Sequence, residues 1–232
     1  MPANRPSGPG CRSSVRRMGN ASRAPRASFA CGLAGAVLFV VVFLVAGALR
    51  PGYSALRHPV SSLALGESGR VQSTSFVATG VLMFAFAVGV RRTAGGLWLS
   101  RLLGVYAIGL AGAGFFRTDP ISGYPAGTPA LGQSTLTGSL HDTFSALVFA
   151  ALPLACGVLA RRCFKSGRTG WAWYSVATAV VFLAGFVLAG VGFAQNAALL
   201  PVAGLLQRLT LVVGWVWVGA LAAHLLRRSA PA

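Results

Sequence analysis

Six long apolar segments dominate this sequence of 232 residues. Each segment has the length of about 20 mostly apolar residues that a helix needs to cross the hydrocarbon core of a bilayer. Inside lipid the backbone must satisfy its own hydrogen bonds, and a helix does so within one segment. The sequence therefore predicts an all-α fold, a six-transmembrane-helix bundle within residues 29–228, with spans over residues 29–49, 73–90, 97–116, 140–160, 170–193 and 204–226.

The composition is typical of a membrane protein and argues against a nucleic-acid-binding one. Hydrophobic residues make up 55% of the chain and charged residues 10%, whereas soluble domains contain about 25% charged residues. The net charge of +17 comes from basic residues beside the apolar segments. No soluble stretch is long enough to build a nucleic-acid-binding face. We expect the lipid bilayer as the partner and no nucleic acid.

Residues 1–28 form a basic region without hydrophobic periodicity. They are rich in Arg, Pro, Ser, Gly and Ala, with arginines at positions 5, 12, 16, 17, 23 and 26. A segment of this composition has too little apolar surface to fold alone, and its arginines attract anionic headgroups. We predict a disordered cytoplasmic tail that meets anionic lipid.

The distribution of Lys and Arg predicts the orientation of the bundle. Fifteen of these residues lie in the tail, in segments 91–101 and 161–168, and after the last span. The alternate side holds five: Arg50, Arg57, Arg70, Arg117 and Arg208. Basic residues concentrate on the cytoplasmic side, so the sequence predicts that both termini are cytoplasmic in a multi-pass protein of the cell membrane.

Polar residues with possible chemistry gather on the predicted outer side. All three acidic residues of the chain lie there, together with two of its three histidines. Ionisable groups at membrane depth usually pair with one another or line a cavity. We therefore predict a polar, ion-paired cluster at the outer mouth of the bundle, formed by His58, Arg117, Asp119, His141, Asp142 and Arg208.

A purely structural interpretation accounts for most of this cluster. Asp119 directly precedes Pro120, a pair typical of a turn that follows a helix. Ser139 and Asp142 have the spacing of a capping box at the start of the fourth span. Arg208 needs a partner, and Asp119 or Asp142 would neutralise it.

Two chemical interpretations remain open beside the structural one. In a membrane hydrolase, His141 would act as general base or activate Ser61, with Asp119 orienting it and the arginines holding a lipid phosphate. In a zinc site, His58 and His141 would bind the ion with one of the two aspartates. No metal-binding spacing supports the zinc site, and a nearby arginine disfavours a cation, so we expect no metal and no cofactor.

Four short pieces stand in this order along the chain: "HPVSSL", "FFRTDP", "SLHD" and "LLQRL". With the spacing of the spans, they resemble the bacterial and archaeal multi-pass membrane family catalogued as domain of unknown function 998, over about residues 30–228. The resemblance implies an integral membrane protein without an established activity, so no catalytic residue is carried over. The resemblance marks His58, Ser61, Asp119, Pro120, His141, Asp142 and Arg208 as positions that match the family's recurring pieces.

The function favoured by these observations is non-catalytic. We expect an integral membrane protein whose outer mouth binds a lipid headgroup or a small anion. The hydrolase using His141 and Asp119 is the first alternative, and a small-molecule carrier is the second. A carrier needs an intramembrane polar path, and the first, second and fifth spans have no charge at their centres, which argues against ion coupling.

Overall fold

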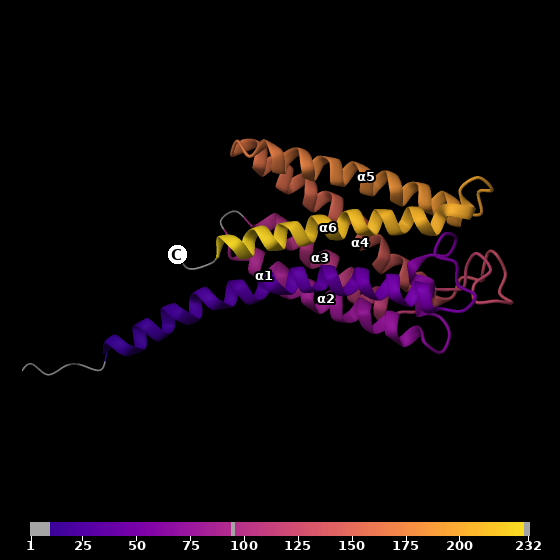
Figure 1. The fold of residues 1–232 in the computed structure, drawn as a ribbon, viewed down its shortest axis with the longest axis horizontal. Coiled ribbons are helices and arrows are strands. Elements are labelled where there is room, and N and C mark those ends of the chain that lie inside the picture. The colour runs from indigo at the N-terminus through magenta and orange to yellow at the C-terminus, as the bar shows by residue number, and fades with distance from the viewer. Residues whose placement is uncertain (1–9, 94–95, 230–232) are drawn as a thin grey trace, which may run out of the picture.

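A computed structural model describes residues 10–93 and 96–229, and all of its regular elements are helical (Figure 1). Two short 3₁₀ helices, η1 (Val60–Ala64) and η2 (Leu200–Val202), lie between the long helices. The long helices are α1 (Gly10–Leu49), α2 (Gly69–Arg91), α3 (Leu97–Phe115), α4 (Leu136–Lys165), α5 (Thr169–Phe193) and α6 (Ala203–Arg228).

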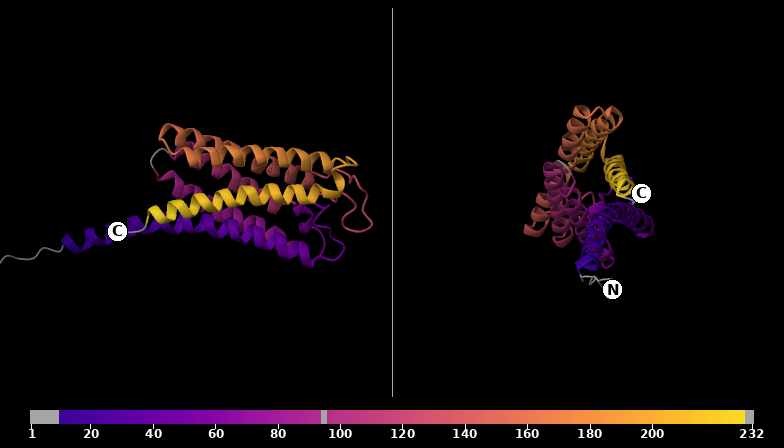
Figure 2. Two further views of the ribbon diagram at one scale, coloured as in Figure 1. Left: turned by 45° about the horizontal axis from the view of Figure 1, so that its top comes forward. Right: turned by 90° about the vertical axis from the view of Figure 1, so that its left-hand side faces the viewer.

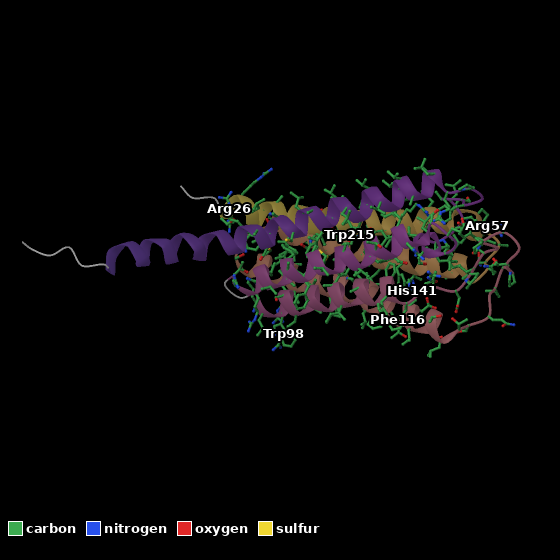
Figure 3. All side chains as sticks on the ribbon, turned by 90° about the horizontal axis from the view of Figure 1, so that it is seen from below. Arg26, Arg57, Trp98, Phe116, His141 and Trp215 are labelled. Atoms are coloured by element: carbon green, nitrogen blue, oxygen red, sulfur yellow. The ribbon has the colours of Figure 1, made fainter. Side chains whose placement is uncertain are left out.

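The six helices form a closed ring in chain order. Each helix packs against its neighbours in the sequence, and α1 packs against α6 to close the ring (Figure 2). We call the end of the bundle at which α6 finishes the terminal end. The opposite end, which holds segments 50–68, 116–135 and 194–202, is the loop end. Arg57 and His141 lie toward the loop end, and Arg26 and Trp98 lie toward the terminal end (Figure 3).

The predicted all-α fold and six-span architecture are confirmed. Six helices are long and apolar enough to cross a membrane. Large apolar side chains are exposed on every one of them, as a lipid-facing surface requires. Examples are Val37, Val81, Ile108, Leu154, Val187 and Val216.

Several predicted boundaries differ from the structure, among them the starts of the first and fourth helices. Residues 10–28, predicted to be disordered, belong to α1, because a helix that the apolar span has already nucleated extends at little cost. The fourth span begins at Leu136 instead of residue 140, because Thr135 caps it: its side chain accepts a hydrogen bond from the Gly138 N–H.

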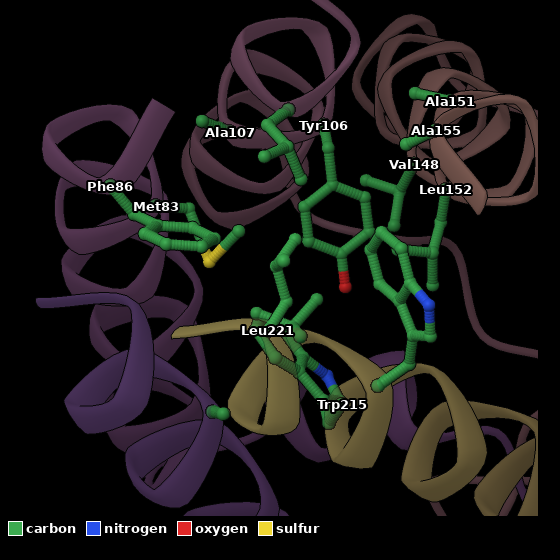
Figure 4. Close-up of a cluster of buried hydrophobic side chains, with 14 of the residues drawn as sticks. Met83, Phe86, Tyr106, Ala107, Val148, Ala151, Leu152, Ala155, Trp215 and Leu221 are labelled. Atoms are coloured by element: carbon green, nitrogen blue, oxygen red, sulfur yellow. The ribbon is translucent and has the colours of Figure 1, made fainter. Parts of the chain in front are cut away.

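Large side chains fill the centre of the ring (Figure 4). Tyr106 of α3 and Trp215 of α6 meet edge to face, with ring centroids 5.4 Å apart. Phe39 of α1 lies 5.1 Å from the Trp215 ring. Leu152 of α4 and Met83 of α2 are fully buried in the same core. This apolar plug holds the middle of the bundle together by close packing.

Glycines of the "GLAGAGF" stretch let α3 approach its neighbours closely. A Cβ added to Gly109 would meet the carbonyl oxygen of Phe144 and a methyl group of Val148, each at 2.8 Å. The stretch therefore serves packing inside the bundle, where small residues allow helix backbones to come together. A Cβ added to Gly104, on the same helix, would meet nothing within 4 Å.

This difference predicts opposite effects of one substitution at two positions. We expect Gly109→Ala to destabilise the protein by about 1–3 kcal/mol, because the backbone of α4 would have to shift. Gly104→Ala should be neutral or stabilising, because alanine favours helix by about 1 kcal/mol over glycine. Thermal unfolding of the purified protein in detergent measures both. Equal behaviour of the two variants would contradict the packing assigned to Gly109.

Candidate functional site

Arg208 holds the first loop of the loop end, residues 50–68, against α6. Its side chain is 6% exposed, and its Nη1 donates hydrogen bonds to the carbonyl oxygens of Ala55 (2.6 Å), His58 (3.0 Å) and Gly204 (2.9 Å). Its Nη2 donates to the Tyr53 hydroxyl, whose ring also lies 5.3 Å from the guanidinium carbon. Carbonyl groups outside a helix need donors when water is excluded, and one guanidinium supplies them here.

The predicted ion pair of Arg208 with Asp119 or Asp142 is not formed. Among the residues that the structure describes, all hydrogen bonds of Arg208 go to backbone carbonyls and Tyr53. The physical reason is local: the loop over residues 53–59 returns across the first turn of α6 and brings its carbonyl oxygens closer than either carboxylate. Arg117 is exposed, and the described chain provides it with no hydrogen bond or ion pair.

Further contacts complete the fastening of this loop. Gln207 Oε1 accepts a hydrogen bond from the Val60 N–H (2.8 Å). Arg50, at the end of α1, donates to the carbonyl oxygens of Leu63 (3.0 Å) and Leu65 (2.9 Å). The pieces "HPVSSL" and "LLQRL", far apart in sequence, are therefore bonded to each other.

Asp119 fastens the second loop of the loop end, residues 116–135, to the start of α4. Its carboxylate accepts hydrogen bonds from the Thr135 N–H (2.8 Å) and the Thr135 hydroxyl (2.6 Å). It lies so close to Gly138 that a Cβ there would clash with it. Asp119 thus anchors a helix start 16 residues away, and the predicted capping box of Ser139 and Asp142 is wrong, because Thr135 occupies the cap position.

His141 faces the end of α3 with one ring nitrogen. Its Nδ1 lies 2.8 Å from the carbonyl oxygen of Ala113 and 3.0 Å from that of Phe116. Both partners are acceptors, so Nδ1 carries the proton and Nε2 is left as an acceptor in the neutral ring. No hydrogen bond joins His141 to Asp119 or Ser61 in the described part of the chain. The orientation by Asp119 that a hydrolase would need is absent there.

A cavity of about 310 Å³ lies between the helices at the loop end. Three predicted site residues line it: Ser61, His141 and Asp142. Most of its wall is apolar, with Phe39, Phe76, Leu110, Phe149, Phe186 and Leu211 among the lining side chains. Thr118, Ser145 and Gln207 add polar groups. The lining includes neither arginine of the predicted cluster nor Asp119.

His58 has a separate, structural place beside the Arg208 contacts. Its ring forms a three-ring cluster with Tyr53 and Tyr124, whose centroids lie 5.4 and 5.0 Å from it and 5.2 Å from each other. Its Nδ1 accepts a hydrogen bond from the Ser54 N–H (2.9 Å). Burial, with added repulsion from the Arg57 charge, lowers the pKa of His58 below its usual value. No three His, Cys, Asp or Glu residues among those described are placed to hold a metal ion.

Sequence reasoning missed Tyr53, Arg50 and Gln207. Tyr53 and Arg50 carry a weak signal, because a tyrosine and an arginine just after an apolar span mark an interfacial segment. Gln207 stands beside Arg208 in a piece already singled out. Their partners are backbone groups of a distant loop, which no spacing reveals.

The fold and these contacts define a multi-pass helical membrane protein. The chain belongs to the family described as protein of unknown function (DUF998), whose model matches residues 33–224. No curated protein and no solved structure matches the chain significantly.

The contacts of Arg208 predict that the shape of its guanidinium group, and not its positive charge alone, stabilises the first loop. We expect Arg208→Gln to lower the free energy of unfolding by about 3 kcal/mol, because several buried carbonyls lose their donor. Arg208→Lys should recover only part of this loss, because one ammonium cannot reach the carbonyls and Tyr53 together. Thermal unfolding in detergent measures both variants, with the exposed Arg117→Gln as a neutral control. Full stability of Arg208→Lys would refute the arrangement.

The lowered pKa of His58 predicts a pH-dependent stability. The unfolded chain binds the histidine proton near pH 6.5, whereas folded His58 binds it only at lower pH. Between these values the unfolded state holds more protons, so stability is lost as the pH falls below about 6.5. His58→Asn retains an acceptor for the Ser54 N–H and cannot titrate, so its melting temperature should depend less on pH. Parallel pH profiles of the two proteins would disprove this assignment.

Proposed function

We propose that the protein binds an amphipathic molecule in the loop-end cavity, with the apolar part inside and the polar head near His141 and Asp142. The cavity itself carries this proposal: its volume of about 310 Å³ falls within the range of small-molecule sites, about 300–1,000 Å³. Its wall combines aromatic and aliphatic side chains with a few polar groups, as such sites do.

The charges around the cavity favour a neutral or cationic head. Among the described residues that line the cavity, Asp142 is the only one with a charged side chain. The Nε2 of His141 and the Ser61 and Ser145 hydroxyls can accept hydrogen bonds from a hydroxyl or amino head. A small anion, the other ligand considered from the sequence, would meet a carboxylate here and no arginine. The geometry therefore supports a lipid-like alcohol or amine better than an anion.

The ligand would come from the outer leaflet. The basic residues of the sequence lie mostly beside the terminal end of the bundle, where Arg91, Arg92, Arg161, Arg162 and Arg228 are found. The positive-inside tendency then orients the loop end, with its cavity, away from the cytoplasm. Both ends of the chain are cytoplasmic in this arrangement, and the bundle lies in the cell membrane.

A carrier is the second candidate, favoured by one observation. Gln72, Ser75 and Thr79 occupy one face of α2, and their buried side-chain oxygens and the Gln72 amide nitrogen have no hydrogen-bond partner among the described residues. Polar atoms at membrane depth without partners are costly unless water or a ligand reaches them. These three side chains could line a path for a polar molecule along α2. A hydrolase has less support, because the Asp119 carboxylate, which would orient His141, accepts its hydrogen bonds from Thr135 instead.

Amphiphiles with equal tails and different heads test the proposal. We expect the purified protein in detergent to bind dodecanol and dodecylamine, measured by native mass spectrometry, and to bind dodecanoate roughly tenfold more weakly. Asp142→Asn should remove the preference for dodecylamine over dodecanoate and leave dodecanol binding unchanged, because only the charge of the site changes.

A pair of variants on α4 provides the control for location. Ala146 lines the cavity, and Ala150, also exposed, does not. Ala146→Leu should weaken binding of all three probes by filling space, while Ala150→Leu should leave it unchanged. Dodecanoate binding as tightly as dodecylamine, or an unaffected Ala146→Leu variant, would refute the proposed site.

A further inference from the structure

A second, larger cavity of about 460 Å³ lies at the terminal end of the bundle. Residues from all six long helices line it, from Phe29 of α1 to Leu221 of α6. Its polar lining is strongly basic and includes Arg92, Arg162, Arg168, Arg228 and His224, beside Thr93 and Ser229. None of the described residues that line it is acidic. The charge of this cavity is therefore opposite in sign to that of the loop-end cavity.

The inner wall of the same cavity is apolar. Phe29, Val90, Leu99, Leu159, Leu221 and Leu225 line it together with Trp171. A ligand that filled the whole space would need an anionic group and an adjoining hydrocarbon part. A free inorganic anion satisfies only the arginines, so the two kinds of wall together select an amphiphile.

His224 adds a hydrogen-bonding atom that no other described residue of the protein uses. Its ring packs against Trp171, with centroids 5.1 Å apart. Its Nε2 is buried and has no hydrogen-bond partner within the described chain. A buried polar atom without a partner is destabilising and usually has an explanation in an unseen water or ligand. His224 lines the basic cavity, so a ligand bound there could be the missing partner of its Nε2.

We infer that the terminal-end cavity binds an anionic phospholipid of the adjacent leaflet. The headgroup phosphate lies among Arg92, Arg168 and Arg228, and the first part of an acyl chain lies on the apolar wall. Guanidinium groups bind phosphate oxygens through paired, charge-assisted hydrogen bonds. This site is distinct from the proposed loop-end site in position and in the charge of its ligand, and it does not depend on that site.

The chain offers a matched control for testing this site. Arg92 and Arg228 line the cavity, whereas their sequence neighbours Arg91 and Arg227 do not, and all four side chains are exposed. Arg92→Gln with Arg228→Gln therefore removes the same charge, at the same end, as Arg91→Gln with Arg227→Gln. General attraction of anionic lipid to the basic end is equal in the two double variants.

Native mass spectrometry with added phosphatidylglycerol and phosphatidylcholine of equal chain length supplies the measurement. We expect wild type and the Arg91/Arg227 double variant to retain phosphatidylglycerol over phosphatidylcholine. The Arg92/Arg228 double variant should lose roughly tenfold in phosphatidylglycerol affinity. Equal losses in the two double variants, or no loss in either, would overturn the site.

Competition identifies the source of the phosphate. Glycerol 3-phosphate at millimolar concentration should not displace phosphatidylglycerol, because it lacks the acyl chain that contacts the apolar wall. Displacement would assign the cavity to a soluble anion and overturn the lipid. If a double variant fails to fold, as judged by its thermal transition, Arg168→Gln and Lys165→Gln replace the pair, since Arg168 lines the cavity and Lys165 does not. Unchanged lipid binding by Arg168→Gln would then overturn the proposal.

Discussion

The conformation of the loop end depends on the hydrogen bonds of the Arg208 guanidinium group. A segment of non-helical backbone packed at the end of a membrane bundle exposes carbonyl groups that have no partner of their own. Arg208 satisfies carbonyls from the loop and from its own helix at once. Because η1 follows directly in the chain, this fastening also sets where Val60 and Ser61 meet the cavity. Tyr53 supports the same contact, and burial raises the pKa of its hydroxyl, which keeps it neutral.

Asp119 fixes the start of α4 by hydrogen bonds, as Arg208 fixes the first loop. Its bonds to Thr135 fix the residue at which α4 begins, and a helix whose first residue is fixed has a fixed rotation about its axis. That rotation turns His141, Asp142 and Ser145 to the cavity. Four of the six residues of the predicted polar cluster thus divide into two groups. Arg208 and Asp119 hold the backbone in place, and His141 and Asp142 line the space that results.

The spans were predictable because a length of about 20 apolar residues has few other uses. The predicted start of the sixth span, at residue 204, lies one residue from the start of α6. The start of α4 was missed because Thr135 receives its anchor from another loop. The partners of Arg208 were missed because residue types do not reveal which backbone carbonyls will lie near a side chain, so the sequence pointed to charged partners such as an aspartate or a lipid phosphate. Neither cavity could be predicted, since each is the volume left between several packed helices.

The two cavities lie on either side of the apolar plug, and this separation constrains the function. Along α6, Leu211 lines the loop-end cavity and Leu221 lines the terminal-end cavity. Trp215 lies between them, 1% exposed, against Phe39 and Tyr106. A molecule could pass from one cavity to the other only if these rings moved apart, against the close packing of the core. Because the cavities also differ in the sign of their charge, one ligand would not suit both. The structure therefore favours two separate binding sites over a single transport path.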